Sequence, residues 1–182
     1  CLCLSMAASA ADFSFALWGD MPYGKNKDAR QTQAVINSIN RSEVAFSIFD
    51  GDFKDGSSRC DDAGYHAAYV MFEGMKKPTV YVPGDNEWTD CHRPSNGSYQ
   101  QSERLEKVRS VFFQEGKSLG QQTLRLENQS KLMPKYRSYI ENARWADQDV
   151  LFVTIDQVGS NNNLDHQVPG AIAEYQARNA AN

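Results

Sequence analysis

Three features of the sequence predict an α/β fold built around a largely parallel sheet. Short apolar runs at residues 13–18, 44–49 and 79–82 each end in a turn that contains Gly and Asp. The segments that follow these turns carry apolar residues at helical spacing. About 41% of the 182 residues are hydrophobic, which suits one buried core. Strands that alternate with helices are typical of parallel sheets, so we expect a single domain over residues 12–182.

The first half of the chain repeats a strand, a loop and a helix. The aromatic run at 13–18 stops at Gly19 and is expected to form a buried strand. Residues 28–41 place apolar side chains on one face of a helix. A second apolar run at 44–49 is followed by a helical pattern over 63–75.

The second half begins with the same pattern and then changes. Residues 79–82 form a short apolar strand between two prolines. We expect a turn near residues 145–148 to join two later strands. The elements expected after residue 100 are a helix over 101–114, strands over 136–140 and 150–155, and a helix from about residue 171.

The N-terminus has the composition of an export signal. Residues 1–11 are an apolar stretch followed by small residues in an A-x-A pattern, which predicts the remnant of a signal peptide. A buried first strand or a frayed terminus is the alternative. Export would make the protein secreted or periplasmic and leave Cys60 and Cys91 in an oxidising compartment. The sequence leaves open whether these two cysteines form a disulfide.

The charge of the chain argues against nucleic acid as a partner, and its hydropathy argues against a membrane span. Acidic residues outnumber basic ones by 23 to 19, and no run of Lys or Arg stands out. Nucleic acid is therefore not expected as a partner. No stretch has the apolar length of a membrane span. We expect a small molecule as the partner.

Acidic residues follow each of the first three strands, in the turns Gly19-Asp20, Gly51-Asp52 and Gly84-Asp85-Asn86. The carboxyl ends of parallel strands meet at one edge of a sheet, which is where such sheets bind ligands. Oxygen ligands at that edge predict bound divalent metal ions, with Asp52 as the bridging ligand between two of them. The predicted metal-binding set is Asp20, Asp52, Asp85 and Asn86.

The residue pattern of these turns, together with Glu87 after the third, resembles that of the calcineurin-like metallophosphoesterase superfamily. The resemblance covers residues 13–160. The resemblance implies a four-layer αββα sandwich that holds two divalent ions, Mn, Fe or Zn. It implies hydrolysis of a small phosphorylated substrate by a water that the metal ions activate. The later histidine ligands of the superfamily are not found, so we expect the chain to be the N-terminal and central part of a domain truncated at its C-terminus.

Two positions depart from the superfamily pattern. Pro22 stands where the first turn carries a His, and Asp85-Asn86 replaces the Asn-His of the third turn. The missing third-turn His is the residue that protonates or orients the leaving oxygen in the superfamily, and His92 could substitute for it. Arg93 and Lys54 could bind phosphate. These three residues are the predicted catalytic groups.

The histidine deficit supports a rival interpretation, in which the chain is a catalytically silent binding domain that keeps the fold and has lost metal ligands. A calcium-stabilised exported structural protein is a third possibility. It fits the oxygen-rich ligands but does not explain why they lie at strand ends.

Overall fold

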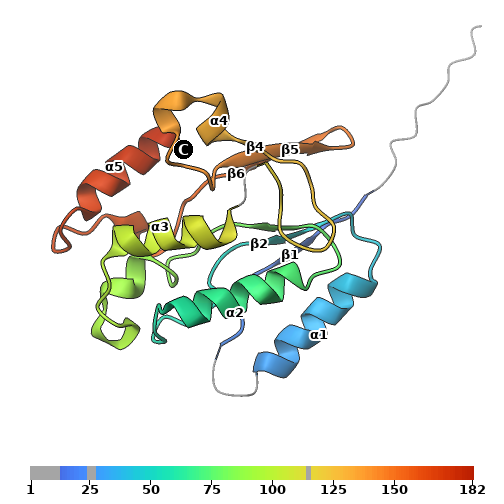
Figure 1. Cartoon of the computed structure of the whole chain (residues 1–182), viewed down its shortest axis with the longest axis horizontal. Helices are drawn as coiled ribbons and strands as arrows, with labels where there is room; N and C mark the ends of the chain where they lie inside the picture. The colour runs from blue at the N-terminus through green and yellow to red at the C-terminus, as the bar shows by residue number, and fades with distance from the viewer. Residues whose placement is uncertain (1–12, 24–27, 114–115) are drawn as a thin grey trace, which may run out of the picture.

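The structure, a computed structural model, describes residues 13–23, 28–113 and 116–182. The predicted signal-peptide remnant at residues 1–11 lies outside these ranges. Figure 1 shows the helices of the first half of the chain on one side of a small sheet and a second sheet on the other side.

The first sheet is parallel, as the sequence predicts. Its strands are β1 (Ala16–Trp18), β2 (Ser47–Phe49) and β3 (Thr79–Tyr81), in that order across the sheet. The helices of this half are α1 (Asp28–Arg41), α2 (Asp62–Glu73) and α3 (Gln101–Phe112). Ala16 pairs with Ser47, and Ser47 pairs with Thr79, so the three strands end level at their carboxyl edge. That edge receives the three acidic turns.

Aromatic side chains join the first sheet to its helices. Trp18 and Phe49 point from the strands to the helix side, and both contact Phe72 of α2, with ring centroids 6.2 and 4.8 Å away. Tyr81 of β3 lies 4.7 Å from Phe112 of α3. These side chains are almost fully buried. Burying a side chain of this size contributes about 1.5–3 kcal/mol, so this layer fixes the strand ends in place.

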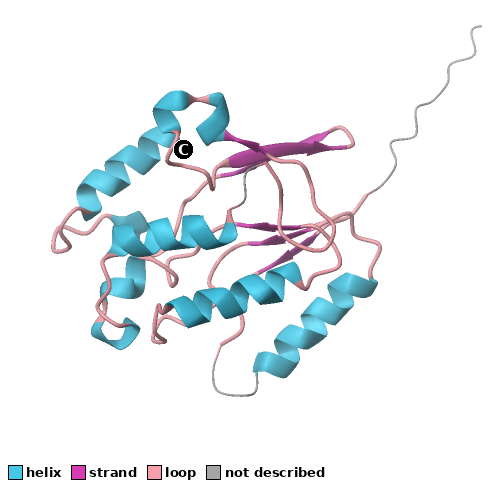
Figure 2. Ribbon diagram, in the orientation of Figure 1, coloured by secondary structure: helices cyan, strands magenta, loops and turns pink. Residues whose placement is uncertain are grey.

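The second sheet is antiparallel and packs against the opposite face of the first. It consists of β4 (Glu127–Asn128), β5 (Ala143–Asp147) and β6 (Val150–Thr154), and it is accompanied by α4 (Gln129–Leu132) and α5 (Ala171–Ala181). The ring of Phe46 meets Trp145 and Phe152 at 5.5 and 5.1 Å between centroids. These rings belong to a hydrophobic cluster between the two sheets. Figure 2 shows the two sheets lying one over the other.

The strand predicted at 136–140 is wrong. That segment follows the short 3-10 helix η3 (Pro134–Tyr136) and forms turns, while β5 occupies the region expected to be a turn. In β5, Ala143 and Trp145 are buried and Arg144 is exposed, which is the alternation of a half-buried strand. Trp145 is the only large apolar residue of this strand, so a search for apolar runs does not find it.

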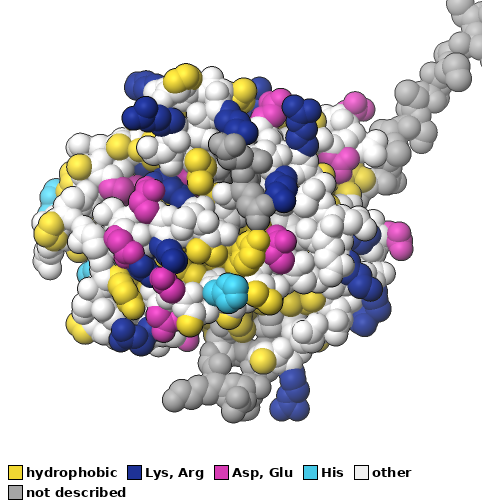
Figure 3. Space-filling model, viewed as in Figure 1, with side chains coloured by type: hydrophobic (Ala, Val, Ile, Leu, Met, Phe, Trp, Pro, Cys, Tyr) yellow, Lys and Arg dark blue, Asp and Glu magenta, His cyan; other side chains and the backbone are white. Residues whose placement is uncertain are grey.

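The α/β class is confirmed: the described residues form five α-helices and two small sheets. The outer face of the second sheet leaves Leu151 and Val153 62% and 63% exposed. Within the described ranges, none of the helices has the length and apolarity that crossing a bilayer requires. Figure 3 shows acidic and basic side chains interspersed over the visible face.

A disulfide joins Cys60, just before α2, to Cys91, just after the third acidic turn. The two Cα atoms are 5.7 Å apart and both residues are fully buried. The bond therefore ties the segment behind the acidic turns to the helix layer.

Reduction of this disulfide is expected to lower the free energy of unfolding by about 2–4 kcal/mol, because the bond closes a long loop in the unfolded chain. Urea unfolding with and without dithiothreitol measures the loss. A Cys60→Ala/Cys91→Ala double variant is the control: it should be equally weakened and insensitive to the reductant. Equal stability of all four samples would contradict a structural role.

Four charged side chains lie buried beneath α5. Arg109 donates two hydrogen bonds to the Glu141 carboxylate, at 2.9 and 2.5 Å. Arg178 lies 3.8 Å from Asp156, whose two carboxylate oxygens accept no hydrogen bond within the described structure. Burial, with the charge of Glu141 adding to it, raises the pKa of Asp156 to about 8.

The raised pKa of Asp156 makes stability depend on pH. The folded protein keeps a proton on this group up to about pH 8, whereas the unfolded chain releases it near pH 4. The free energy of unfolding should therefore fall as pH rises between these values, by at most about 1.4 kcal/mol per unit. Between these pH values, the free energy of unfolding of Asp156→Asn should fall less than that of the wild type. Urea titrations at pH 5, 7 and 9 test this, and parallel pH profiles would refute it.

Candidate functional site

The three acidic turns touch one another through their backbones. Gly51 has a φ of 101°, and a Cβ there would lie 2.5 Å from the nitrogen of Gly84. A Cβ on Gly84 would lie 2.1 Å from Oδ1 of Asp52. Only glycine permits this approach, so the second and third turns pack backbone against backbone.

Both Asp20 and Asp52 adopt left-handed backbone conformations, with φ of 54° and 63°. This region costs a non-glycine residue of order 1 kcal/mol, and such strain clusters at functional sites. Asp and Asn tolerate it best because their side chains bond locally. The backbone thus places the carboxylates of Asp20 and Asp52 at the edge of the sheet, and the strained φ values lower the free energy of unfolding.

Hydrogen bonds connect the first turn to the other two. The Tyr23 hydroxyl donates to Oδ1 of Asp20 at 2.7 Å and accepts from Nδ2 of Asn86 at 3.2 Å. Oδ1 of Asp52 accepts from the Asn86 backbone at 3.1 Å. Burial, together with the hydrogen bond to Asp20, raises the pKa of Tyr23 far above its usual range, so its hydroxyl remains a donor. Asp20, Asp52 and Asn86 therefore belong to one network.

Glu87 holds the second and third turns together from beneath. Its carboxylate accepts from the backbone nitrogens of Asp52 and Gly84, at 3.1 and 2.8 Å, and from the Tyr81 hydroxyl at 2.8 Å. The residue is fully buried. Burial raises its pKa to about 8, with the charge of Asp52 adding to the rise and the donated hydrogen bonds opposing it. Glu87 is a positioning residue for Asp52.

Asp85 lies in a second cluster beside the network. Oγ of Ser160 is 2.6 Å from Oδ2 of Asp85 and 2.7 Å from Oδ1 of Asp90. Arg93 pairs with the other oxygen of Asp90 at 2.5 Å, and its own side chain is 44% exposed. Burial raises the pKa of Asp90. Arg93 thus stands at the surface and is linked to Asp85 through Ser160, whose Oγ lies 3.4 Å from Nη2 of Arg93.

The other two predicted catalytic residues are engaged with the backbone. Nζ of Lys54 is buried and donates to the carbonyls of Asp55 and Asn86, both at 2.8 Å. Burial lowers its pKa. Nδ1 of His92 lies 2.7 Å from the carbonyl of Thr89, a contact that requires a proton on Nδ1 and leaves Nε2 for other partners.

The carboxylates of the turns repel one another. Burial raises the pKa of Asp52, and the charges of Asp85 and Asp20 raise it further. A cation would relieve this repulsion. All the available donors are oxygens, which fits a hard cation such as Mg2+ or Mn2+ better than Zn2+. Among the residues that the structure describes, no three His, Cys, Asp or Glu side chains converge in a metal-binding group.

No known protein family matches the chain, and no curated protein or solved structure is significantly similar to it. The assignment of function therefore depends on the site itself.

Sequence reasoning missed the residues that join the turns. Tyr23 stands three residues after Asp20, and Glu87 directly follows Asn86, so both lay within the motifs that were recognised. Ser160 is 75 residues from Asp85, and nothing in the sequence links the two. Only the fold brings Ser160 to the carboxyl edge of the first sheet.

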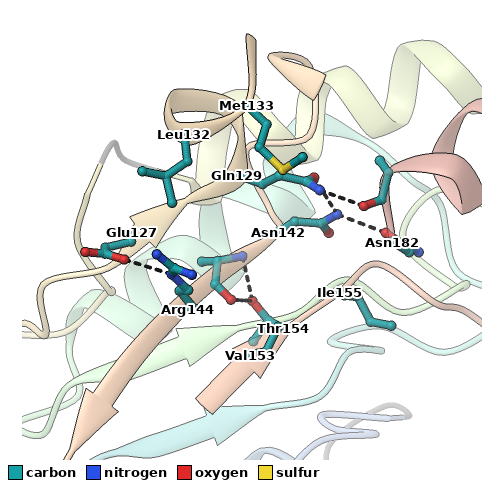
Figure 4. A pocket seen from close by; sticks show the side chains of 12 residues that line it. Glu127, Gln129, Leu132, Met133, Asn142, Arg144, Val153, Thr154, Ile155 and Asn182 are labelled. Carbon is teal, nitrogen blue, oxygen red and sulfur yellow. Dashed lines mark hydrogen bonds and ion pairs between the residues drawn. The ribbon is translucent and has the colours of Figure 1, made fainter. Parts of the chain in front are cut away.

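A separate hollow of about 180 Å³ lies on the second sheet, bordered by β5, β6, α4 and the C-terminal residues (Figure 4). Leu132, Met133 and Val153 are among the apolar residues that line it. The amide of Asn142 bonds Gln129 and Asn182, at 3.1 and 2.9 Å. None of the residues that line this hollow belongs to the acidic turns, so it is not part of the candidate site.

Proposed function

We propose that this chain hydrolyses phosphoester bonds with the help of a divalent cation bound at the acidic turns. The observation that carries the proposal is the hydrogen-bonded network in which Asp20, Asp52 and Asn86, from three successive strand ends, share one edge of a parallel sheet. The resemblance of these turns to metallophosphoesterases supplies the substrate class and the expectation of a four-layer sandwich. The two packed sheets and the helix layer are in keeping with that sandwich.

The residues of the site take different roles in this proposal. Asp20, Asp52 and Asn86 hold the cation, and Asp85 lies at its border. A bound divalent cation lowers the pKa of a coordinated water and so supplies a nucleophile near neutral pH. Arg93 is the phosphate contact. Its guanidinium is partly exposed near the third turn and can donate two hydrogen bonds to one phosphate group.

Lys54 and His92 act differently from the sequence-based expectation in this proposal. Lys54 gives its hydrogen bonds to two backbone carbonyls, so we assign it to holding the third turn against the loop after β2. Only Nδ1 of His92 is engaged, so its Nε2 is the atom that would protonate the leaving group, and it does so from the doubly protonated ring.

Turnover of aryl phosphate monoesters and diesters with added Mg2+, Mn2+, Zn2+ or Fe2+ tests the proposal. A rate that requires metal supports it. Elemental analysis of the same sample counts the ions, and we expect about one per chain from the donor set.

A catalytically silent binding domain that has lost metal ligands is the second candidate, favoured by the lack of three converging His, Cys, Asp or Glu side chains among the described residues. Absence of turnover, with or without bound metal, would select it. A rate that requires metal would exclude it.

Export is part of the proposal. The buried disulfide between Cys60 and Cys91 supports it, because such bonds persist in secreted and periplasmic proteins. Finding the protein in the exported fraction of its native cells, with this bond oxidised, would support the assignment. Retention in the cytoplasm would contradict it.

A further inference from the structure

A polar cavity of about 190 Å³ adjoins the candidate site. It lies between the 3-10 helix η1 (Thr89–His92), the start of α3 and the turn η4 (Ser160–Asn163). Asp90, Arg93 and Ser160 belong both to its wall and to the cluster around Asp85. A group bound in the cavity would therefore sit next to a phosphate at the acidic turns.

Three amide side chains of the cavity wall have unused hydrogen-bonding capacity. Oε1 of Gln101 and Oδ1 of Asn163 are buried without a donor, although the residues are only 4% and 2% exposed. The side chain of Asn161 is exposed and makes no hydrogen bond within the described structure. Leaving a buried polar atom unpaired costs about 1–3 kcal/mol. This concentration around one cavity indicates that a hydrogen-bonding ligand belongs there.

The turn that carries Asn161 is held in a costly conformation. Residues 160–163 all have positive φ, between 47° and 66°. Buried contacts keep them so: Arg178 donates to the side chain and carbonyl of Asn162, and Asn163 donates to Glu174 at 2.7 Å. Asn161 itself takes no part in these contacts. The contacts of Asn162 and Asn163 thus fix the backbone of the turn, while the Asn161 amide stays free at the cavity wall.

The composition of the wall identifies the class of ligand. All nine lining residues are polar, and the one ring among them is the imidazole of His92, so the wall offers little apolar surface for a base or an aryl group. Of the two carboxylates in the wall, Asp90 is paired with Arg93 and Asp165 accepts the backbone N–H of Gln167 at 2.8 Å, so the wall does not attract an anion. Its free amide donors and acceptors suit a neutral ligand whose hydroxyl groups both donate and accept.

We infer that this cavity binds a small hydroxyl-rich group, a sugar or cyclic polyol. This inference rests on the proposed function only in its second claim, that the group is the alcohol part of the phosphoester that the acidic turns hydrolyse. Asn161 is then a specificity-determining residue. Its exposed amide meets the hydroxyl groups, while Gln101 and Asn163 supply acceptors beneath it after a small side-chain rotation.

Titration of the full chain with glucose and with myo-inositol, followed by NMR chemical shifts, tests the ligand class. Both compounds lack phosphate, so the outcome does not depend on catalysis. Asn161→Gly removes the amide and leaves a residue that suits the φ of 55°. We expect saturable binding of at least one compound to the wild type, weakened about fivefold or more in this variant, because an amide contributes about that factor through one hydrogen bond.

Gln148→Gly is the matched control, because Gln148 is also exposed with a positive φ, 51°, but lies in the turn between β5 and β6. It should bind as the wild type does, and neither variant should have a lowered melting temperature. Equal binding by Asn161→Gly and wild type would overturn the inference, as would the absence of saturable shifts, which would show that the cavity holds only water. Should the chain prove not to hydrolyse phosphoesters, the titration still decides the ligand class.

Discussion

Replacing Asp52 with asparagine is expected to lower the metal-dependent rate of phosphoester hydrolysis by at least about 100-fold, the upper end of what is lost when a residue behind a metal ligand is changed. Asp52 carries the charge that binds the cation most directly, because it lies between the first and third turns. Asparagine tolerates its φ of 63° and keeps an oxygen for the backbone of Asn86. The fold should therefore survive.

The rate with saturating Mn2+ and the melting temperature without metal are measured on the same preparations. In the metal-free state the variant should melt no lower than the wild type, because it removes one of the mutually repelling carboxylates. Asp55→Asn is the matched control, since Asp55 caps the turn of Ser57 and Ser58 and lies outside the network. An Asp52→Asn enzyme with a wild-type rate would remove Asp52 from the site.

Replacing Arg178 with methionine is expected to lower the free energy of unfolding by roughly 3–5 kcal/mol, the loss typical of breaking a buried ion pair from one side. Arg178 is fully buried and donates to Glu174 at 2.7 Å, to the carbonyl of Asp156 at 2.6 Å and to that of Asn162 at 2.8 Å. Its guanidinium also lies 5.0 Å from the Trp88 ring, next to the third acidic turn. Methionine fills the space but leaves these acceptors unpaired.

Urea unfolding of the variant measures this loss. Arg178→Lys should lie between wild type and methionine, because an ammonium keeps the charge but cannot reach all of the acceptors. Arg144→Met is the surface control: its partner is Glu127, both side chains are 52% exposed, and the expected loss is about 1 kcal/mol or less. Equal losses for Arg178→Met and Arg144→Met would mean that burial does not determine how much each arginine contributes to the free energy of unfolding.

The parallel half of the fold could be predicted from the sequence because its signals are local. Residues 28–41 were expected to be helical, and α1 spans Asp28–Arg41. The apolar run at 79–82 became β3, Thr79–Tyr81. In each case the periodicity of the side chains matches the face that is buried.

The second sheet was harder to foresee, because its strands depend on distant partners. Arg144 in β5 faces solvent opposite Glu127 of β4, and Trp145 alone anchors the buried side. Such a strand is stabilised by cross-strand pairs rather than by its own apolar content. The largely parallel sheet expected from the alternation of strands and helices therefore accounts for only one of the two observed sheets.

The positions of the candidate metal ligands could be predicted, but not the frame that holds them. Strand ends and Gly-Asp pairs locate Asp20 and Asp52 because both signals are short-range. The buried clamp made by Glu87 and the contact of Ser160 with Asp85 join residues up to 75 positions apart. Sequence spacing carries no information on such contacts.

The three acidic turns are fastened unequally. Glu87 locks the second and third from within the core, whereas the first is held by the Tyr23 hydroxyl and by the backbone bond from Asp20 to the carbonyl of Gly51 at 3.1 Å. Opening of this edge therefore begins at the first turn, and amide hydrogens should exchange with solvent sooner at Asp20 than at Asp52. The side of the site next to β1 is therefore the side that we expect to open to a ligand, while the second and third turns stay in place.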